Sequence, residues 1–151
     1  MKQSCLALLK MLDDEGLSLF ISKNSDLIYS SKMAGITPLL DVIDRIELVS
    51  LSGSTVVDKV VGKAAALLIV YISALRVCSK LMSRAAAKVL EKHSIDFLSL
   101  ETVDFIANRD GSDVCPFEKI VSRTDEPTEA YLLLKKTALS SQSPGGSPPN
   151  D

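Results

Sequence analysis

The stretch Thr55–Tyr71 reads TVVDKVVGKAAALLIVY, and the rest of the chain is organised around it. Apolar side chains recur along it at i, i+3, i+4 and i+7, which is the spacing of one apolar face of a helix. Thr55 with Asp58 three residues later is typical of a capping box, so the pattern predicts a helix that begins near Val56. The opposite face carries small residues such as Gly62, so we expect this helix to be covered on more than one side.

Two lysines stand in the first two turns of this predicted helix. Lys59 and Lys63 are four residues apart, so on a helix they share one face and repel each other by roughly 0.2–0.5 kcal/mol. The helix dipole also disfavours cations at this end, and a bound anion would reverse that effect. We therefore interpret Asp58, Lys59, Gly62 and Lys63 as a binding site for a small anionic molecule. The alternative is two surface lysines that Asp58 partly neutralises.

Composition restricts the classes of function. The net charge is −2 and no basic block occurs, which argues against general nucleic-acid binding. Hydrophobic residues make up 46% of the chain, enough for a core, but the apolar run after Lys63 is too short to cross a membrane. The three cysteines, Cys5, Cys78 and Cys115, are widely spaced and odd in number. We interpret them as reduced thiols and expect a cytoplasmic protein.

The remaining elements are predicted from periodicity and from glycine, proline and serine signals. They are a helix at 4–14, a hairpin of strands at 17–22 and 27–30, a helix opened by Pro38 with Thr37 as N-cap, a serine-rich connection at 48–54, a strand at 75–82, a helix at 84–92 capped by Ser83, a strand at 95–100, a short helix opened by Cys115–Pro116, and a last helix opened by Pro127 with Ala130, Leu133 and Leu134 inward.

This order predicts a mixed sheet with an antiparallel hairpin at one edge, a parallel remainder and helices on both faces. The fold class is therefore α/β, a three-layer α/β/α sandwich. We expect one domain over residues 1–138. The segment 139–151 is rich in serine, proline and glycine, and we expect it to be a disordered tail.

Two motifs resemble those of a small prokaryotic family of domains of unknown function. They are DKVVGKAAA at Asp58–Ala66 and NRDGSDVCPFE at Asn108–Glu118. The resemblance extends from Cys5 to about Leu134 and implies a cytidine-deaminase-like fold. It implies no established activity.

The zinc chemistry of deaminases can be tested on the residues themselves. A zinc deaminase needs H-x-E or C-x-E at one helix start and P-C-x-x-C at the next, so that three ligands hold Zn²⁺. The first predicted position reads DKV or, in a shifted register, GKA, and the second reads SRAAA, so neither supplies the pattern. His93 ends a helix, where we expect it to be solvated. We predict a protein that is not a zinc-dependent deaminase, with no metal and no cofactor, and an anion-binding pocket at the helix starts lined by Asp58, Lys59, Lys63, Ser83 and Arg84.

Cys115 is a second candidate, as a catalytic nucleophile. With Pro116 as the first helical residue, Cys115 stands at the N-cap, where the helix dipole favours a thiolate. Asn108 and Arg109 on the preceding loop add an amide and a positive charge to the predicted ligand-binding residues. Glu118 is placed to complete a capping box with the N–H of Cys115. The alternative is a small residue at a tight junction, because no histidine is placed to act as its base.

Three readings of function remain open. The first is a zinc-free deaminase-like domain that binds a small anionic ligand, nucleotide-like or containing phosphate. The second is a metal-independent acyl or nucleotidyl transferase or hydrolase that uses Cys115. The third is a structural or oligomerisation module, because the apolar helix faces leave room for a homodimer.

Overall fold

The computed structural model describes residues 2–108 and 110–141. Its elements in chain order are α1 (Lys2–Asp14), β1 (Leu19–Lys23), β2 (Asp26–Ser31), α2 (Thr37–Arg45), α3 (Leu48–Leu51), β3 (Thr55–Val61), α4 (Lys63–Tyr71), β4 (Arg76–Ser83), α5 (Arg84–Lys92), β5 (Asp96–Val103), α6 (Pro116–Ile120) and α7 (Pro127–Ser141).

The five strands form one mixed sheet in the order β2-β1-β3-β4-β5. β1 pairs antiparallel with both β2 and β3, whereas β3, β4 and β5 run parallel. Asp58 of β3 lies opposite Leu19 of β1 on one side and Ser79 of β4 on the other. The predicted hairpin edge with a parallel remainder is therefore confirmed.

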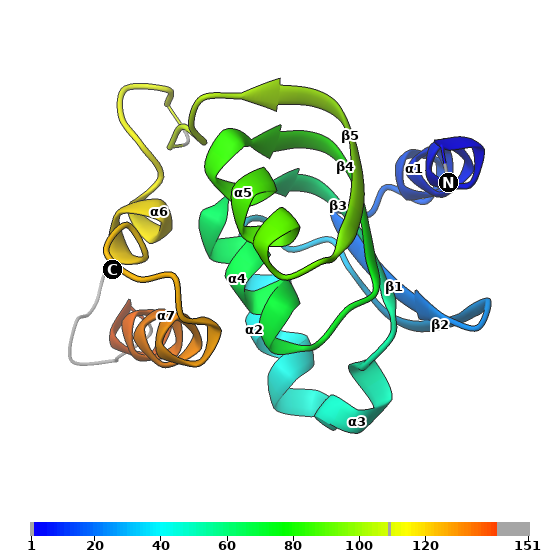
Figure 1. The fold of residues 1–151 in the computed structure, drawn as a ribbon, viewed down its shortest axis with the longest axis horizontal. Helices are drawn as coiled ribbons and strands as arrows, with labels where there is room; N and C mark the ends of the chain where they lie inside the picture. Colours follow the sequence, from blue (N-terminus) through cyan, green and yellow to red (C-terminus); the bar gives the residue numbers. More distant parts are fainter. Residues whose placement is uncertain (1, 109, 142–151) are drawn as a thin grey trace.

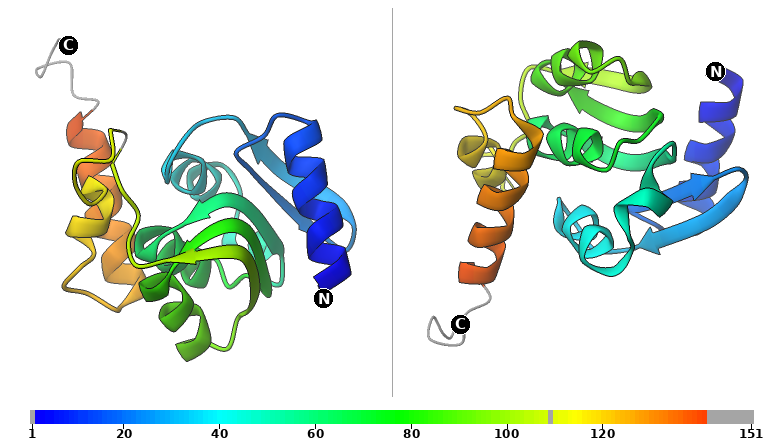
Figure 2. Two further views of the ribbon diagram at one scale, coloured as in Figure 1. Left: turned by 90° about the horizontal axis from the view of Figure 1, so that it is seen from above. Right: turned by 60° about the horizontal axis from the view of Figure 1, so that its bottom comes forward.

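Helices cover both faces of the sheet, which confirms the α/β/α sandwich (Figure 1). α1 packs on one face through Cys5, Leu9 and Leu12, against Phe20 and Val57 of the sheet. α2, α4 and α5 lie on the other face, and α6 and α7 lie outside α4 (Figure 2). α4 is thus buried between the sheet and α7, and its residues from Ala64 to Ile69 are all buried. This burial explains why α4 has small and apolar side chains on every face.

The helix predicted over the whole of 55–71 is wrong in its first half. Thr55–Val61 is a strand, and the helix begins only at Lys63, with Gly62 as N-cap. The capping box of Thr55 and Asp58 therefore does not form. The four valines of this segment are β-branched and favour a strand paired on both sides. Lys59 and Lys63 consequently do not share a helix face.

Cys5 and Cys78 form a disulfide bond that ties α1 to β4, with their Cα atoms 5.5 Å apart. The prediction that all three cysteines are reduced thiols is therefore wrong for this pair. Cys115 is a free thiol, as predicted.

Several local predictions need smaller corrections. Thr37 is the first residue of α2 rather than its cap, the N-cap Ile36 makes no side-chain cap bond, and the predicted connection at 48–54 contains the short helix α3. Leu133 is 38% exposed, whereas Ala130 and Leu134 are buried as predicted.

The end of the predicted domain also shifts. α7 continues through Ser141, so residues 139–141 are helical rather than part of a disordered tail. The rest of the predicted tail lies outside the described residues. None of the helices in the part of the chain that the structure describes has the length and apolar composition that a bilayer-spanning segment requires.

Candidate functional site

A cavity of about 280 Å³ lies where β3 ends and α4 begins. We call it the strand-end pocket. Its walls come from the start of β1, the end of β2, the start of α2, the end of β3, the start of α4 and the segment around α6. The lining residues are Ser18, Lys32, Ala34, Gly35, Ile36, Asp58, Lys59, Val60, Gly62, Ala65, Ile106, Cys115, Phe117 and Glu118. Ligand crevices of open α/β sheets lie in this position, outside the carboxyl ends of parallel strands.

Asp58 is the buried ionisable residue of this pocket. Asp58 is only 5% exposed. Its Oδ1 atom accepts a hydrogen bond from the backbone N–H of Val60 at 3.4 Å. Its Oδ2 atom is buried and has no hydrogen-bond partner among the described residues. Burial raises the pKa of Asp58 to about 8, against the opposing effect of the backbone N–H groups of Val60 and Lys59. The carboxyl group therefore carries a proton at neutral pH.

Two lysines line the same pocket, Lys32 after β2 and Lys59 in β3. Both residues are exposed, and neither forms an ion pair with any residue that the structure describes. Their ammonium groups therefore have no paired counter-charge in the described part of the chain.

Glu118 occupies the start of α4. Its Oε1 and Oε2 atoms accept hydrogen bonds from the backbone N–H groups of Lys63 at 2.7 Å and Ala64 at 2.8 Å. The carboxylate thus accepts hydrogen bonds from two of the N–H groups that have no partner within the helix, at its positive end. The predicted capping box between Glu118 and Cys115 is wrong, because the N–H of Cys115 donates to the carbonyl oxygen of Ile106 instead.

Gly62 allows this approach. A Cβ atom on Gly62 would lie 2.5 Å from Oε1 and 2.6 Å from Cδ of Glu118. Only glycine leaves room for the carboxylate in its present position. The group that comes close to Gly62 therefore belongs to the protein itself.

Cys115 lies at the N-cap of α6, as predicted, and its thiol is free and half-buried. It lines the strand-end pocket together with Asp58 and Lys59. Asn108 lies outside the lining of this pocket, and its side-chain amide donates to Ser112 Oγ at 3.3 Å. Arg109, the other loop residue predicted to bind the ligand, lies outside the described residues.

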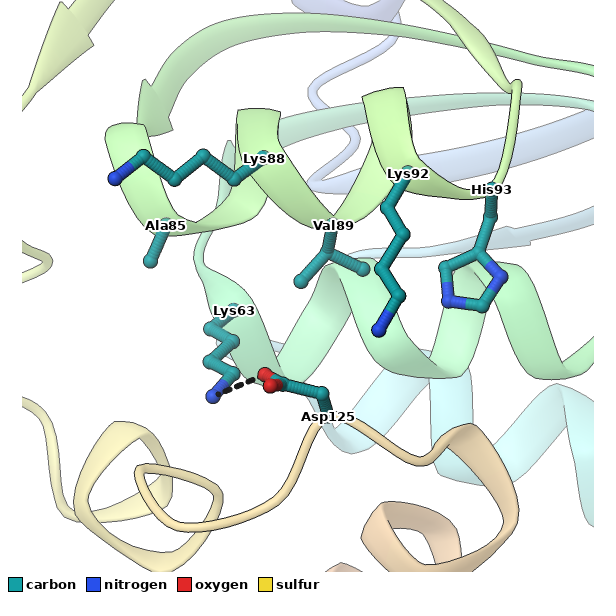
Figure 3. Close-up of a pocket in the computed structure, with 7 residues that line it drawn as sticks. All are labelled: Lys63, Ala85, Lys88, Val89, Lys92, His93 and Asp125. Carbon is teal, nitrogen blue, oxygen red and sulfur yellow. Dashed lines mark ion pairs between the residues drawn. The ribbon is translucent and has the colours of Figure 1, made fainter.

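Three more predicted pocket residues have other roles. Lys63 does not line the strand-end pocket and forms an ion pair with Asp125 at 3.0 Å (Figure 3). Ser83 is buried and accepts a hydrogen bond from the N–H of Ala86, so it caps α5 as predicted. Arg84 pairs with Asp104 at 2.8 Å. The structure therefore brings together Asp58, Lys59, Gly62 and Cys115, but not Lys63, Ser83 or Arg84.

Part of the pocket was missed by sequence reasoning. Gly35 and Ile36 bring the start of α2 to it, and Ile106 and Phe117 form an apolar wall near Cys115. The hydrophobic residues beside the Cys115–Pro116 helix start were a readable signal for that wall. The position of α2 depends on the sheet topology, so no local pattern revealed it.

The residues do not fit a zinc centre of the deaminase type. The described residues contain no group of three or more His, Cys, Asp or Glu side chains that could hold a metal ion. In addition, no H-x-E, C-x-E or C-x-x-C motif occurs anywhere in the sequence.

These features define an α/β sandwich with a mixed five-stranded sheet and a pocket at its strand ends. The chain belongs to the family of the domain of unknown function DUF1893, whose model matches residues 7–137. A crystal structure at 2.70 Å of a DUF1893 family protein, TM1506 from Thermotoga maritima, is similar to it with a TM-score of 0.81. The two are 31% identical, and the match covers 91% of each chain. No curated protein matches the chain.

Proposed function

We propose that the strand-end pocket binds a small molecule that has an anionic group and an apolar body. The observation that supports this proposal most directly is Asp58, a buried carboxyl group on the wall of a cavity, with one oxygen that lacks a partner among the described residues. Burying such a group is costly, and this cost is offset when a ligand supplies the hydrogen bond.

The charges of the pocket favour an anion. Asp58 is protonated at neutral pH, because its pKa is about 8. The charge of Glu118 faces the N–H groups of α4. Lys32 and Lys59 therefore leave the pocket with an excess of positive charge. Ile36, Phe117 and other apolar side chains supply a surface for an uncharged ring or chain.

The binding mode differs from the one expected from sequence. Glu118 already accepts from the first two N–H groups of α4, so the helix start is not open to the ligand in this conformation. Lysine side chains and the proton of Asp58 take over the role that helix N–H groups were expected to have. A volume of about 280 Å³ is near the lower end for ligand pockets, which favours a ligand of metabolite or single-nucleotide size.

The resemblance of the two sequence motifs implies a scaffold of the deaminase-like kind. We propose that it retains a ligand pocket of that kind without the zinc chemistry. The position of the pocket and the lack of zinc-binding motifs support this proposal, and the link to deaminases is an analogy of fold.

A second candidate function is covalent catalysis by Cys115. It is favoured by one observation, that a free and half-buried thiol lines the same cavity as a carboxyl group with a raised pKa. The Cys115 thiolate, its proton lost to solvent, would attack the acyl or nucleotidyl centre, the bond to the leaving group would break, and the protonated Asp58 would give its proton to that leaving group. His93 lines a different cavity and is not available as the base.

A thermal-shift screen of nucleotides, nucleosides and simple phosphates tests the binding proposal. A ligand that binds the native state raises its melting temperature by mass action. We expect a hit whose shift is lost in Lys59→Ala and in Asp58→Asn but is kept in Lys136→Ala, which removes an exposed lysine of α7. If no compound shifts the wild type, or if Lys136→Ala abolishes the shift equally, the proposal fails.

A further inference from the structure

A second cavity of about 270 Å³ lies on the other side of α4, between α4, α5 and the segment before α7. We call it the α4–α5 groove. It is lined by Lys63, Ala85, Lys88, Val89, Lys92, His93 and Asp125 (Figure 3). Lys59, Asp58 and Cys115 are not among these residues, so the groove is separate from the strand-end pocket.

Positive charge dominates the α4–α5 groove. Three lysines and one carboxylate line it, although the whole protein has a net charge of −2. Lys88 and Lys92 are four residues apart on α5, so their charges repel each other. An anion in the groove would relieve that repulsion.

The ammonium group of Lys63 needs a partner, because its side chain is only 15% exposed. Asp125 supplies it at 3.0 Å, and its own side chain is 69% exposed. Lys63, by hydrogen bonding and charge, holds the pKa of Asp125 below its usual range, and the charge of Lys92 adds to this effect. Asp125 is therefore a mostly exposed counter-anion on the solvent side of a largely buried cation.

His93 adds an unused hydrogen-bonding atom. Its Nε2 atom is buried and has no partner among the described residues. Figure 3 shows the side chains of Lys92 and His93 next to each other on the same side of the groove, whereas Lys88 points away from Asp125. The expectation that His93 is a solvated helix end is wrong, because the residue is half-buried.

We propose that the α4–α5 groove is a second ligand site, which binds the phosphate group of a small molecule. The phosphate takes the place of the Asp125 carboxylate beside Lys63 and is also held by Lys92, with Lys88 at the rim. Phosphate carries more charge and more acceptor oxygens than a carboxylate, so it competes with Asp125 for the same cation. Asp125 then acts as a built-in competitor that occupies the site when no ligand is bound.

The test is a titration with inorganic phosphate and with pyrophosphate at constant ionic strength. Changes in the backbone NMR chemical shifts monitor binding. Chloride at matched ionic strength is the control for general screening. We expect the shifts to centre on Lys63, Lys92 and Asp125. Lys92→Ala should weaken the affinity by about fivefold, and Asp125→Asn should strengthen it by about fivefold, the scale of one partly exposed charge contact.

Two further variants separate this site from the strand-end pocket. Lys59→Ala and Asp58→Asn should leave phosphate binding in the groove unchanged. The proposal is overturned if chloride causes the same shifts, if Asp125→Asn does not bind more tightly, or if Lys59→Ala weakens binding as much as Lys92→Ala. Binding of a single-stranded nucleic acid with no response to either phosphate probe would also contradict it.

Discussion

The backbone N–H of Lys63 donates to Oε1 of Glu118 at 2.7 Å, although the two residues are 55 positions apart in the chain. Through this bond and the adjacent one from Ala64, a side chain of α6 caps the buried helix α4. The contact joins the segment that carries Cys115 to the start of the central helix. It therefore fixes one wall of the strand-end pocket.

Removing this cap should destabilise the protein. Glu118→Ala leaves two N–H groups at the start of α4 without their acceptor, so we expect the free energy of unfolding to fall by about 1–3 kcal/mol. Glu118→Gln keeps one acceptor oxygen and should cost less. Urea denaturation of the three proteins measures the difference. Equal stability of Glu118→Ala and the wild type would show that the cap does not form in solution.

Gly62→Ala should be destabilising only while Glu118 is present. The new Cβ atom would lie within 2.5 Å of the carboxylate and would push it away from the N–H groups. In the Glu118→Ala background the same change should cost little, because nothing remains to be displaced. A double-mutant cycle measures this coupling. Additive effects of the two substitutions would contradict the close approach seen here.

Asp58 should make the stability depend on pH in a defined direction. Below about pH 4 the carboxyl group is protonated in both the native and the unfolded state. Between about pH 4 and pH 8 the unfolded chain loses the proton while the native state keeps it, because the native pKa is about 8. The free energy of unfolding should therefore fall in this window, by up to about 1.4 kcal/mol per pH unit, and level off above it.

Asp58→Asn is the matched control for this titration. The amide does not titrate, so the difference in stability between the variant and the wild type isolates Asp58 from every other group. We expect that difference to shift in favour of Asp58→Asn as the pH rises from 4 to 8, measured by denaturant midpoints. A difference that stays constant over the window would contradict a buried, protonated Asp58.

Cys115 separates the binding function from the covalent one. If the pocket only binds its ligand, alkylation of the folded protein by iodoacetamide should be no faster than that of free cysteine, because the thiol is half-buried. A ligand in the strand-end pocket should slow the reaction further, because Cys115 lines it. Alkylation faster than that of free cysteine would favour the catalytic alternative.

The disulfide between Cys5 and Cys78 should stabilise the fold without touching the pocket. It closes a loop with a sequence separation of 73, so Cys5→Ala/Cys78→Ala should lower the free energy of unfolding by about 2–4 kcal/mol. Alkylation under denaturing conditions should modify one cysteine before reduction and all three after it. Modification of three cysteines without reductant would show reduced thiols, as first expected from the sequence.

Local signals predicted much of the fold. Ser83 before an alanine-rich helix and Cys115–Pro116 at another helix start correctly marked two boundaries, because caps are set by neighbouring residues. The stretch 55–71 was misread because its valines fit both a helical spacing and a buried strand. Gly62 was read as an interior helix residue, but it is the junction between β3 and α4.

The sequence predicted only those residues of the candidate site that lie close to one another in the chain. Asp58, Lys59 and Gly62 lie at the pocket under either reading, because a strand end and a helix start occupy the same few residues. Lys63 was misplaced because a helical spacing of four put it beside Lys59. The bond to Glu118 and the disulfide of Cys5 join residues far apart in sequence, and no local pattern encodes such contacts.

In the proposed function, Asp58 is a buried carboxyl group that holds a proton for a ligand in the strand-end pocket. The most direct measurement is the ¹³C chemical shift of its carboxyl carbon as a function of pH, with and without a hit from the ligand screen. We expect a midpoint of about 8 in the free protein and a higher midpoint with ligand bound, because the ligand accepts the proton's hydrogen bond. A midpoint of about 4, that of an exposed aspartate, or one that the ligand does not move, would contradict it.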